Sequence, residues 1–228
     1  MNSRKGWEMC SASRLKDSSL PFVDVIESLC FCLDKDILEY ALIKELINGT
    51  LDEKLFRFFL TQQVCLWHEI SQQLIAKSSL KHTPYSRSFF LKIANFSLIE
   101  ADNLDRQLDD CKISSYEITP VCKAYINFLD ALEEKFLFLT AILPRFWLKA
   151  KLYQRIVKLN SFKHPYKRYI KYCLYHDARE PIIRIIDTLN TQFRTISKEE
   201  IPKIQQVVLE AAAHECELLN EAYSLVAI

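Results

Sequence analysis

A glutamate stands on the apolar face of the predicted C-terminal helix. Apolar residues recur in that segment at steps of three and four, which is the spacing of one helix face, and Glu215 falls among them. A buried carboxylate costs free energy unless it is paired, hydrogen-bonded or protonated, so Glu215 is a candidate functional residue. A buried salt bridge or a place at the rim of the core would explain it equally well. The face consists of Ile204, Val208, Ala211, Glu215, Leu218 and Ala222.

An amide and two cations lie in similar patterns. Gln63 stands in the middle of the apolar stripe of an earlier predicted helix, where its amide needs an internal partner. Arg145 and Lys149 are four residues apart and therefore share a helix face with Ile142 and Leu152. A second face of the same segment is equally apolar. The periodicity therefore leaves open whether the two cations point into the core or into solvent.

A tyrosine and a cysteine complete the set of candidate residues. Tyr125 lies with Val121 and Phe128 on the helix predicted after Pro120, and Cys173 continues the stripe of aromatic residues that follows His164. Each of the two also has a purely structural explanation as a core residue.

Several kinds of site are excluded by spacing and composition. The five histidines are scattered, and no pair of C-x-x-C units occurs, so we predict no metal site and no cofactor. The chain has only two glycines, which leaves no glycine-rich phosphate loop, and it lacks a G-x-S-x-G elbow. A net charge of +1 implies no field-driven attraction to nucleic acid or to anionic lipid. We therefore predict neither nucleic acid nor a membrane as a partner.

The elements that must position these residues are helices. Apolar steps of three and four run through the chain, and no alternating strand pattern occurs, which predicts an all-α bundle of seven to eight helices. Gly49 is expected to end a helix, Thr50 and Glu53 to form a capping box, and Thr119-Pro120 to begin a helix. Pro181 is expected to kink or split its helix. The predicted helices cover residues 21–48 (with a break near 34–36), 50–77, 85–111, 119–139, 141–159, 164–193 and 197–227.

The chain organisation predicts one helical domain, residues 19–228, preceded by a flexible polar tail, residues 1–18. The tail has no apolar core of a secretory signal, and no apolar stretch is long enough to span a bilayer. The eight cysteines show no disulfide framework, so we expect reduced thiols in a cytoplasmic protein.

Five segments together resemble the TenA (thiaminase II) family, which has the haem-oxygenase-like fold. Segment 143–149 is similar to the family's L-P-C-x-W-x-Y, segment 169–173 to its W-I-x-x-Y, and segment 214–218 to its closing helix. The similarity covers roughly residues 35–227. The five segments are Gly49–Leu51, Phe59–Gln63, Leu143–Lys149, Tyr169–Cys173 and His214–Leu218.

The resemblance implies a helical bundle around a central pocket, a homo-oligomer (dimer or tetramer), and hydrolysis of thiamine or of its aminopyrimidine fragment in thiamine metabolism. In that family an aspartate binds the pyrimidine, a cysteine attacks it, and a glutamate of the last helix handles protons. The resemblance assigns the catalytic glutamate to Glu215 and a pocket tyrosine to Tyr125.

This sequence departs from the family at the other positions. Gln63 stands for the aspartate, Arg145 for the nucleophilic cysteine, and Lys149 and Cys173 for two tyrosines. An arginine cannot serve as the nucleophile. We therefore expect a small-molecule ligand to be bound by Gln63, Tyr125, Arg145, Lys149 and Cys173, with the candidate catalytic residue Glu215 beside them.

Three functions stay open at this point. The first is a TenA-like protein with an altered pocket that binds a small, anionic molecule and, if it is an enzyme, is a related hydrolase. The second is a non-catalytic interaction protein that kept the scaffold and filled the pocket with an ion pair. The third is a thiamine-salvage hydrolase with Cys122 or Cys173 as a relocated nucleophile. An open cavity of several hundred cubic ångströms would favour the first over the second.

Overall fold

The computed structural model describes residues 39–79, 84–108, 117–156, 158–159, 163–175, 179–193 and 195–226. This part of the chain forms eight α-helices, a 3-10 turn and no strand, which confirms the all-α prediction. The predicted tail and most of the first predicted helix lie outside these residues. The elements are α3 (Ala41–Asn48), α4 (Glu53–Ser79), α5 (Pro84–Leu108), α6 (Pro120–Asp130), α7 (Lys135–Ile156), α8 (Lys167–Tyr175), α9 (Arg179–Phe193), η2 (Lys198–Glu200) and α10 (Ile201–Val226).

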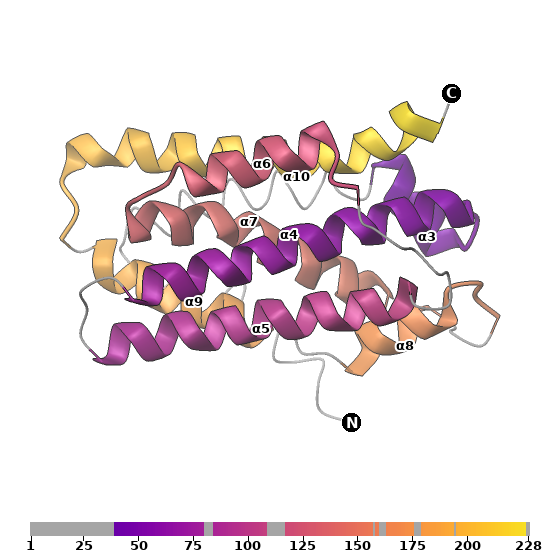
Figure 1. The fold of residues 1–228 in the computed structure, drawn as a ribbon, viewed down its shortest axis with the longest axis horizontal. Coiled ribbons are helices and arrows are strands. Elements are labelled where there is room, and N and C mark those ends of the chain that lie inside the picture. The colour runs from indigo at the N-terminus through magenta and orange to yellow at the C-terminus, as the bar shows by residue number, and fades with distance from the viewer. Residues whose placement is uncertain are drawn as a thin grey trace.

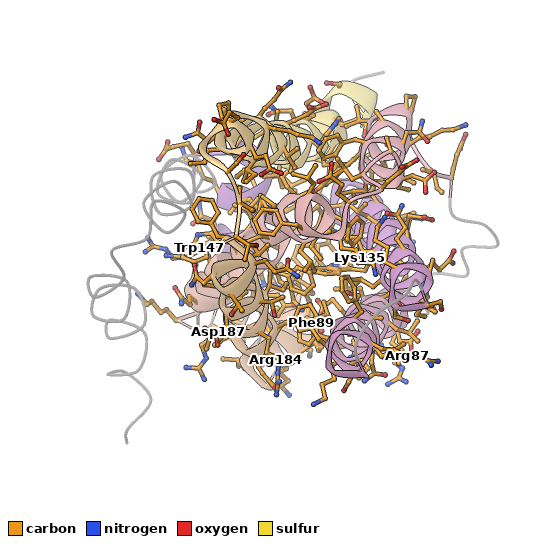
Figure 2. The ribbon with its side chains drawn as sticks, turned by 90° about the vertical axis from the view of Figure 1, so that its left-hand side faces the viewer. Arg87, Phe89, Lys135, Trp147, Arg184 and Asp187 are labelled. Atoms are coloured by element: carbon orange, nitrogen blue, oxygen red, sulfur yellow. The ribbon has the colours of Figure 1, made fainter. Side chains whose placement is uncertain are left out.

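The long helices lie side by side around α7 (Figure 1). α4 packs along α5, α10 packs along α6, and α7 contacts α8, α9 and α10. The view along the bundle shows side chains filling the space between the helices (Figure 2). None of the described helices combines the length and hydropathy needed to cross a bilayer.

Helix α7 is buried on nearly every side, which explains why its periodicity left the inward face undecided. Of its 22 residues, 16 are buried, including Arg145 and Lys149. A helix enclosed in this way must bury its polar side chains as well, and each of them then needs a partner inside the protein.

Several helix ends agree with the predictions. Gly49 follows α3 with a φ of 72°, in the left-handed region that favours glycine. The Thr119 side chain accepts a hydrogen bond from the Cys122 amide, and Pro120 is the first residue of α6. The segment predicted at 164–193 is divided into α8 and α9, with Pro181 in the first turn of α9, where a missing amide is tolerated.

Two predicted boundaries were wrong. The capping box of Thr50 and Glu53 does not form, because α4 begins at Glu53 and the preceding Asp52 accepts a hydrogen bond from the Lys54 amide at 2.8 Å.

The helix predicted for 119–139 ends early, at Asp130, and α7 begins at Lys135. The Lys77 side chain of α4 donates to the carbonyl of Leu132 at 2.7 Å, so a contact from a distant segment satisfies a carbonyl in the connection between α6 and α7. No local sequence signal marks this break.

Candidate functional site

The guanidinium of Arg145 is held between two other helices. Arg145, on α7, is 2% exposed. Its Nη1 donates to both carboxylate oxygens of Glu215 on α10, at 3.2 Å each, and its Nη2 donates to Oε1 of Gln63 on α4 at 2.7 Å. The guanidinium carbon also lies 4.6 Å from the ring centroid of Trp67, which is within cation–π range. We call Arg145, Gln63 and Glu215 the arginine end of the site.

One donor of this guanidinium is left over. The Nε–H of Arg145 is buried and finds no hydrogen-bond partner among the described residues. Buried donors are nearly always paired, because an unpaired one forfeits the hydrogen bond that water would supply. The arginine end therefore has an unused donor.

The second cation of α7 is paired with a carboxylate of α5. Lys149, 9% exposed, forms an ion pair with Glu100, which is 1% exposed. Tyr153 donates to Oε1 of Glu100 at 2.6 Å, and Tyr172 donates to its other oxygen. We call Lys149, Glu100, Tyr153 and Tyr172 the lysine end of the site.

Aromatic rings surround the ammonium group of Lys149. Its Nζ lies 4.4 Å from the ring centroid of Phe96, 5.1 Å from that of Tyr153 and 5.2 Å from that of Trp67. Burial lowers the pKa of Lys149, against the opposing pull of Glu100. Burial acts to raise the pKa of Glu100, but Lys149 and the two tyrosine hydroxyls outweigh it and hold that pKa below its ordinary value.

The two ends line one small cavity of about 50 Å³. Its wall combines both ion pairs with apolar and aromatic side chains from α3, α4, α5, α7, α8 and α10. A cavity of this size holds roughly four water molecules. The polar and aromatic lining residues are Phe59, Gln63, Trp67, Glu100, Arg145, Lys149, Tyr153, Tyr169 and Glu215.

Four of the six residues singled out in the sequence line this cavity: Gln63, Arg145, Lys149 and Glu215. The other two, Tyr125 and Cys173, do not. Tyr125 stacks on His214, with ring centroids 5.1 Å apart, and burial followed by the charge of Glu215 raises its pKa. Cys173 is buried near Lys149 and Glu100, outside the lining.

None of the cysteines within the described residues lines the cavity. Burial raises the pKa of Cys122 to about 12, and burial together with the charge of Glu100 holds the pKa of Cys173 well above its ordinary value. The thiolate is the reactive form of cysteine, so neither residue is prepared as a nucleophile. Within the described residues, Cys65, Cys122 and Cys173 are free thiols; four of the other cysteines lie outside these residues.

Glu100, Tyr153 and Tyr172 were missed as site residues. Glu100 falls on the buried stripe of α5 with Ile93, Ser97 and Leu104, so its spacing marks it in the same way as that of Glu215. Tyr153 and Tyr172 gave no signal of their own, since an aromatic residue on an apolar face is usually core. Within the described residues, no group of three histidines, cysteines or acids could hold a metal ion.

Comparison with known proteins places this chain in a family. The profile of the TENA/THI-4/PQQC family matches residues 33–225. The chain belongs to this family. Among solved structures, a TenA homologue from Pyrococcus furiosus is similar with a TM-score of 0.76 and 17% identity, covering 87% of this chain and 100% of that chain. A domain of unknown function with a heme oxygenase-like fold from Shewanella denitrificans has a TM-score of 0.68 and 10% identity, covering 92% and 95%. The haem-oxygenase-like fold is thereby confirmed.

One similar protein is named for thiamine biosynthesis. The thiamine biosynthesis multifunctional protein ThiED of Corynebacterium efficiens is 24% identical over 195 residues. These residues make up 82% of this chain but only 26% of that protein. The chain therefore spans about a quarter of the length of this relative.

Proposed function

We propose that this TENA/THI-4/PQQC family member binds a small anionic molecule in its central cavity and does not hydrolyse thiamine. The observation that carries the proposal is the unpartnered Nε–H of Arg145, buried in a wall that also contains Lys149. A carboxylate suits an arginine particularly well, because guanidinium N–H groups can donate two parallel hydrogen bonds to its oxygens.

The absence of thiaminase chemistry follows from the groups at the cavity wall. Displacement at a pyrimidine needs a nucleophile, and an arginine stands where the resemblance puts the attacking cysteine. Glu215, the carboxylate that the resemblance makes catalytic, has both oxygens engaged by Arg145. It would have to leave this pair before it could activate a water molecule or a substrate.

The size of the cavity limits the size of the ligand. About 50 Å³ is far below the several hundred cubic ångströms of a pocket for a drug-sized molecule. A small carboxylate or another oxyanion of a few atoms fits this volume, whereas thiamine is too large for it. The ThiED similarity supports a link to thiamine-related metabolism, in which the chain would bind a small reactant or fragment.

A non-catalytic interaction protein is the second candidate, and the size of the cavity favours it, because about 50 Å³ is far below the several hundred cubic ångströms expected of an open ligand pocket. Both cations already have carboxylate partners from their own chain, and the space left is small. In this reading the ion pairs fill a pocket that the scaffold no longer uses.

Ligand-dependent stabilisation of the purified protein tests the proposal. We expect formate, acetate or bicarbonate to raise the melting temperature above that in chloride of equal ionic strength. A ligand at a hundred times its Kd stabilises by about 2.7 kcal/mol. Arg145→Lys keeps the charge but loses the fork, so it should weaken the response. Arg184→Ala is the matched control, because Arg184 lies near the edge of the bundle (Figure 2) and its side chain is 44% exposed.

Assays with thiamine and with aminomethylpyrimidine complete the test. We expect turnover near background, because loss of a covalent nucleophile costs several kcal/mol of transition-state stabilisation. Turnover that Cys173→Ser or Cys122→Ser abolishes would establish a relocated nucleophile instead. An unchanged melting temperature with every anion, and no turnover, would favour the interaction protein.

A further inference from the structure

Two cations of different chemistry face the same cavity, and both lie against the same indole ring. The Arg145 guanidinium carbon is 4.6 Å and the Lys149 Nζ is 5.2 Å from the ring centroid of Trp67. The two residues are one helical turn apart on α7, so their side chains project from neighbouring positions. A small molecule held by Arg145 would thus lie next to the amine of Lys149.

The surroundings of Lys149 are those of a reactive amine. A lysine becomes a nucleophile when it is desolvated or lies beside another cation, since both conditions favour the neutral amine. Lys149 is buried among three aromatic rings and has Arg145 one turn away. Its pKa is accordingly lowered, chiefly by burial. Glu100 is in contact with the ammonium group and can accept a proton from it.

Lys77 shows that burial alone does not create this arrangement. It is also 9% exposed, and burial also lowers its pKa. Its Nζ donates to the carbonyl of Leu132 and lies over the ring of Phe138, and it does not line the cavity. Lys77 therefore provides an internal reference for Lys149.

We infer that the cavity binds a small 2-oxo acid, with its carboxylate on Arg145 and its carbonyl carbon in imine linkage to Lys149. The inference rests on the proposed anion site and names the class of anion. A 2-oxo acid places a carbonyl carbon directly beside a carboxylate, which matches an arginine and a lysine on one cavity wall. Glyoxylate, the smallest such acid, suits the small volume best.

Formation of the imine consumes neither an oxidant nor a reductant. The Lys149 ammonium gives one proton to Glu100, and the nitrogen lone pair attacks the carbonyl carbon, so that a C–N bond forms and the C=O π bond breaks. The oxygen takes up the proton from Glu100 and a second proton from the nitrogen, and leaves as water while the C=N bond forms. Two of the three ammonium protons thus leave with the water, and the third stays on a cationic iminium nitrogen. Glu100 ends as a carboxylate beside that charge.

Reductive trapping on the full chain tests the inference. The protein is incubated with low concentrations of glyoxylate and cyanoborohydride, whose hydride would convert the iminium into a stable N-carboxymethyl lysine, and the site is mapped by peptide mass spectrometry. We expect Lys149 to be labelled before Lys77 and the exposed lysines. Acetaldehyde lacks the carboxylate, so with acetaldehyde Lys149 should no longer be labelled before the other lysines. Labelling that spreads over surface lysines and spares Lys149 would overturn the inference.

Two variants separate the imine from the binding of the anion. Lys149→Arg keeps a cation for Glu100 but cannot form an imine, so labelling at this position should vanish while Lys77→Arg leaves it intact. Glycolate, which has the carboxylate but no carbonyl, should raise the melting temperature of both variants. Stabilisation by glycolate without any label on Lys149 in the native chain would refute the imine and leave the anion site standing. Absence of stabilisation by any carboxylate would refute the proposed function itself.

Discussion

The arginine end and the lysine end of the cavity solve the same problem in different ways. Each buries a cation of α7 against a carboxylate of another helix. At the lysine end, two tyrosine hydroxyls and the ammonium group surround Glu100. At the arginine end, the partners are one carboxylate and one amide, and the Nε–H donor stays unpaired. The two ends thus differ in the groups that hold the carboxylate, while each cation keeps buried N–H donor capacity for a ligand.

The largest expected effect comes from removing the carboxylate at each end. Glu100→Gln leaves the Lys149 charge buried without a counter-charge, and breaking a buried pair in this way costs about 3–5 kcal/mol. Glu215→Gln also removes the counter-charge of a buried cation, but Gln63 still accepts from Arg145, so we expect a loss near the lower end of the same range, about 3 kcal/mol. Urea unfolding of both variants at neutral pH measures the difference. An equal or larger loss for Glu215→Gln would mean that the arginine end is the main structural pair.

The arginine end was largely visible in the sequence. Glu215 and Gln63 interrupt apolar stripes of helices that bury one face, and such interruptions can be read from spacing alone. The direction of Arg145 and Lys149 could not be read in this way, because α7 is buried on nearly every side. It was the family resemblance that placed them in the pocket.

The lysine end and parts of the fold depend on contacts between distant segments. Glu100 could have been found by its stripe, but its grouping with Tyr153 and Tyr172 arises from the packing of α5 against α7 and α8. Likewise, the break between α6 and α7 is stabilised by Lys77 from α4. A local pattern carries no information about which distant side chain will supply a partner.

The next largest effect is expected from removing one tyrosine hydroxyl of the lysine end. Tyr153→Phe removes a hydrogen bond to the buried Glu100 carboxylate, and bonds to charged groups are worth about 1.5–3 kcal/mol. The matched control is Tyr166→Phe, because the Tyr166 hydroxyl donates to the backbone carbonyl of Leu51. A bond to such a neutral acceptor is worth about 0.5–1.5 kcal/mol. Urea unfolding that ranks Tyr166→Phe as the more harmful change would contradict the special role of Glu100.

The smallest expected effect is a change with pH in the free energy of unfolding that Tyr153→Phe costs. The pKa of folded Glu100 lies below its ordinary value of 4.5, so its contribution to stability is complete above that value and is lost as the pH falls through the folded pKa. Tyr153→Phe should raise the folded pKa towards the ordinary value, since it removes a donor to the charged form. The free energies of unfolding of the native protein and of this variant should therefore converge as the pH falls below about 4.5 towards the folded pKa of native Glu100, by at most about 1.4 kcal/mol per pH unit.

The Tyr166→Phe variant distinguishes this convergence from general acid unfolding. The hydroxyl that this variant lacks donates to a backbone carbonyl that does not titrate. The difference in free energy of unfolding between this variant and the native protein should therefore stay constant over the same range. Urea titrations at closely spaced pH values, carried out on all three proteins, give the two differences directly. Parallel curves for the native protein and Tyr153→Phe would mean that the tyrosine does not stabilise the Glu100 charge. The lysine end would then be held by the ion pair and the aromatic rings alone.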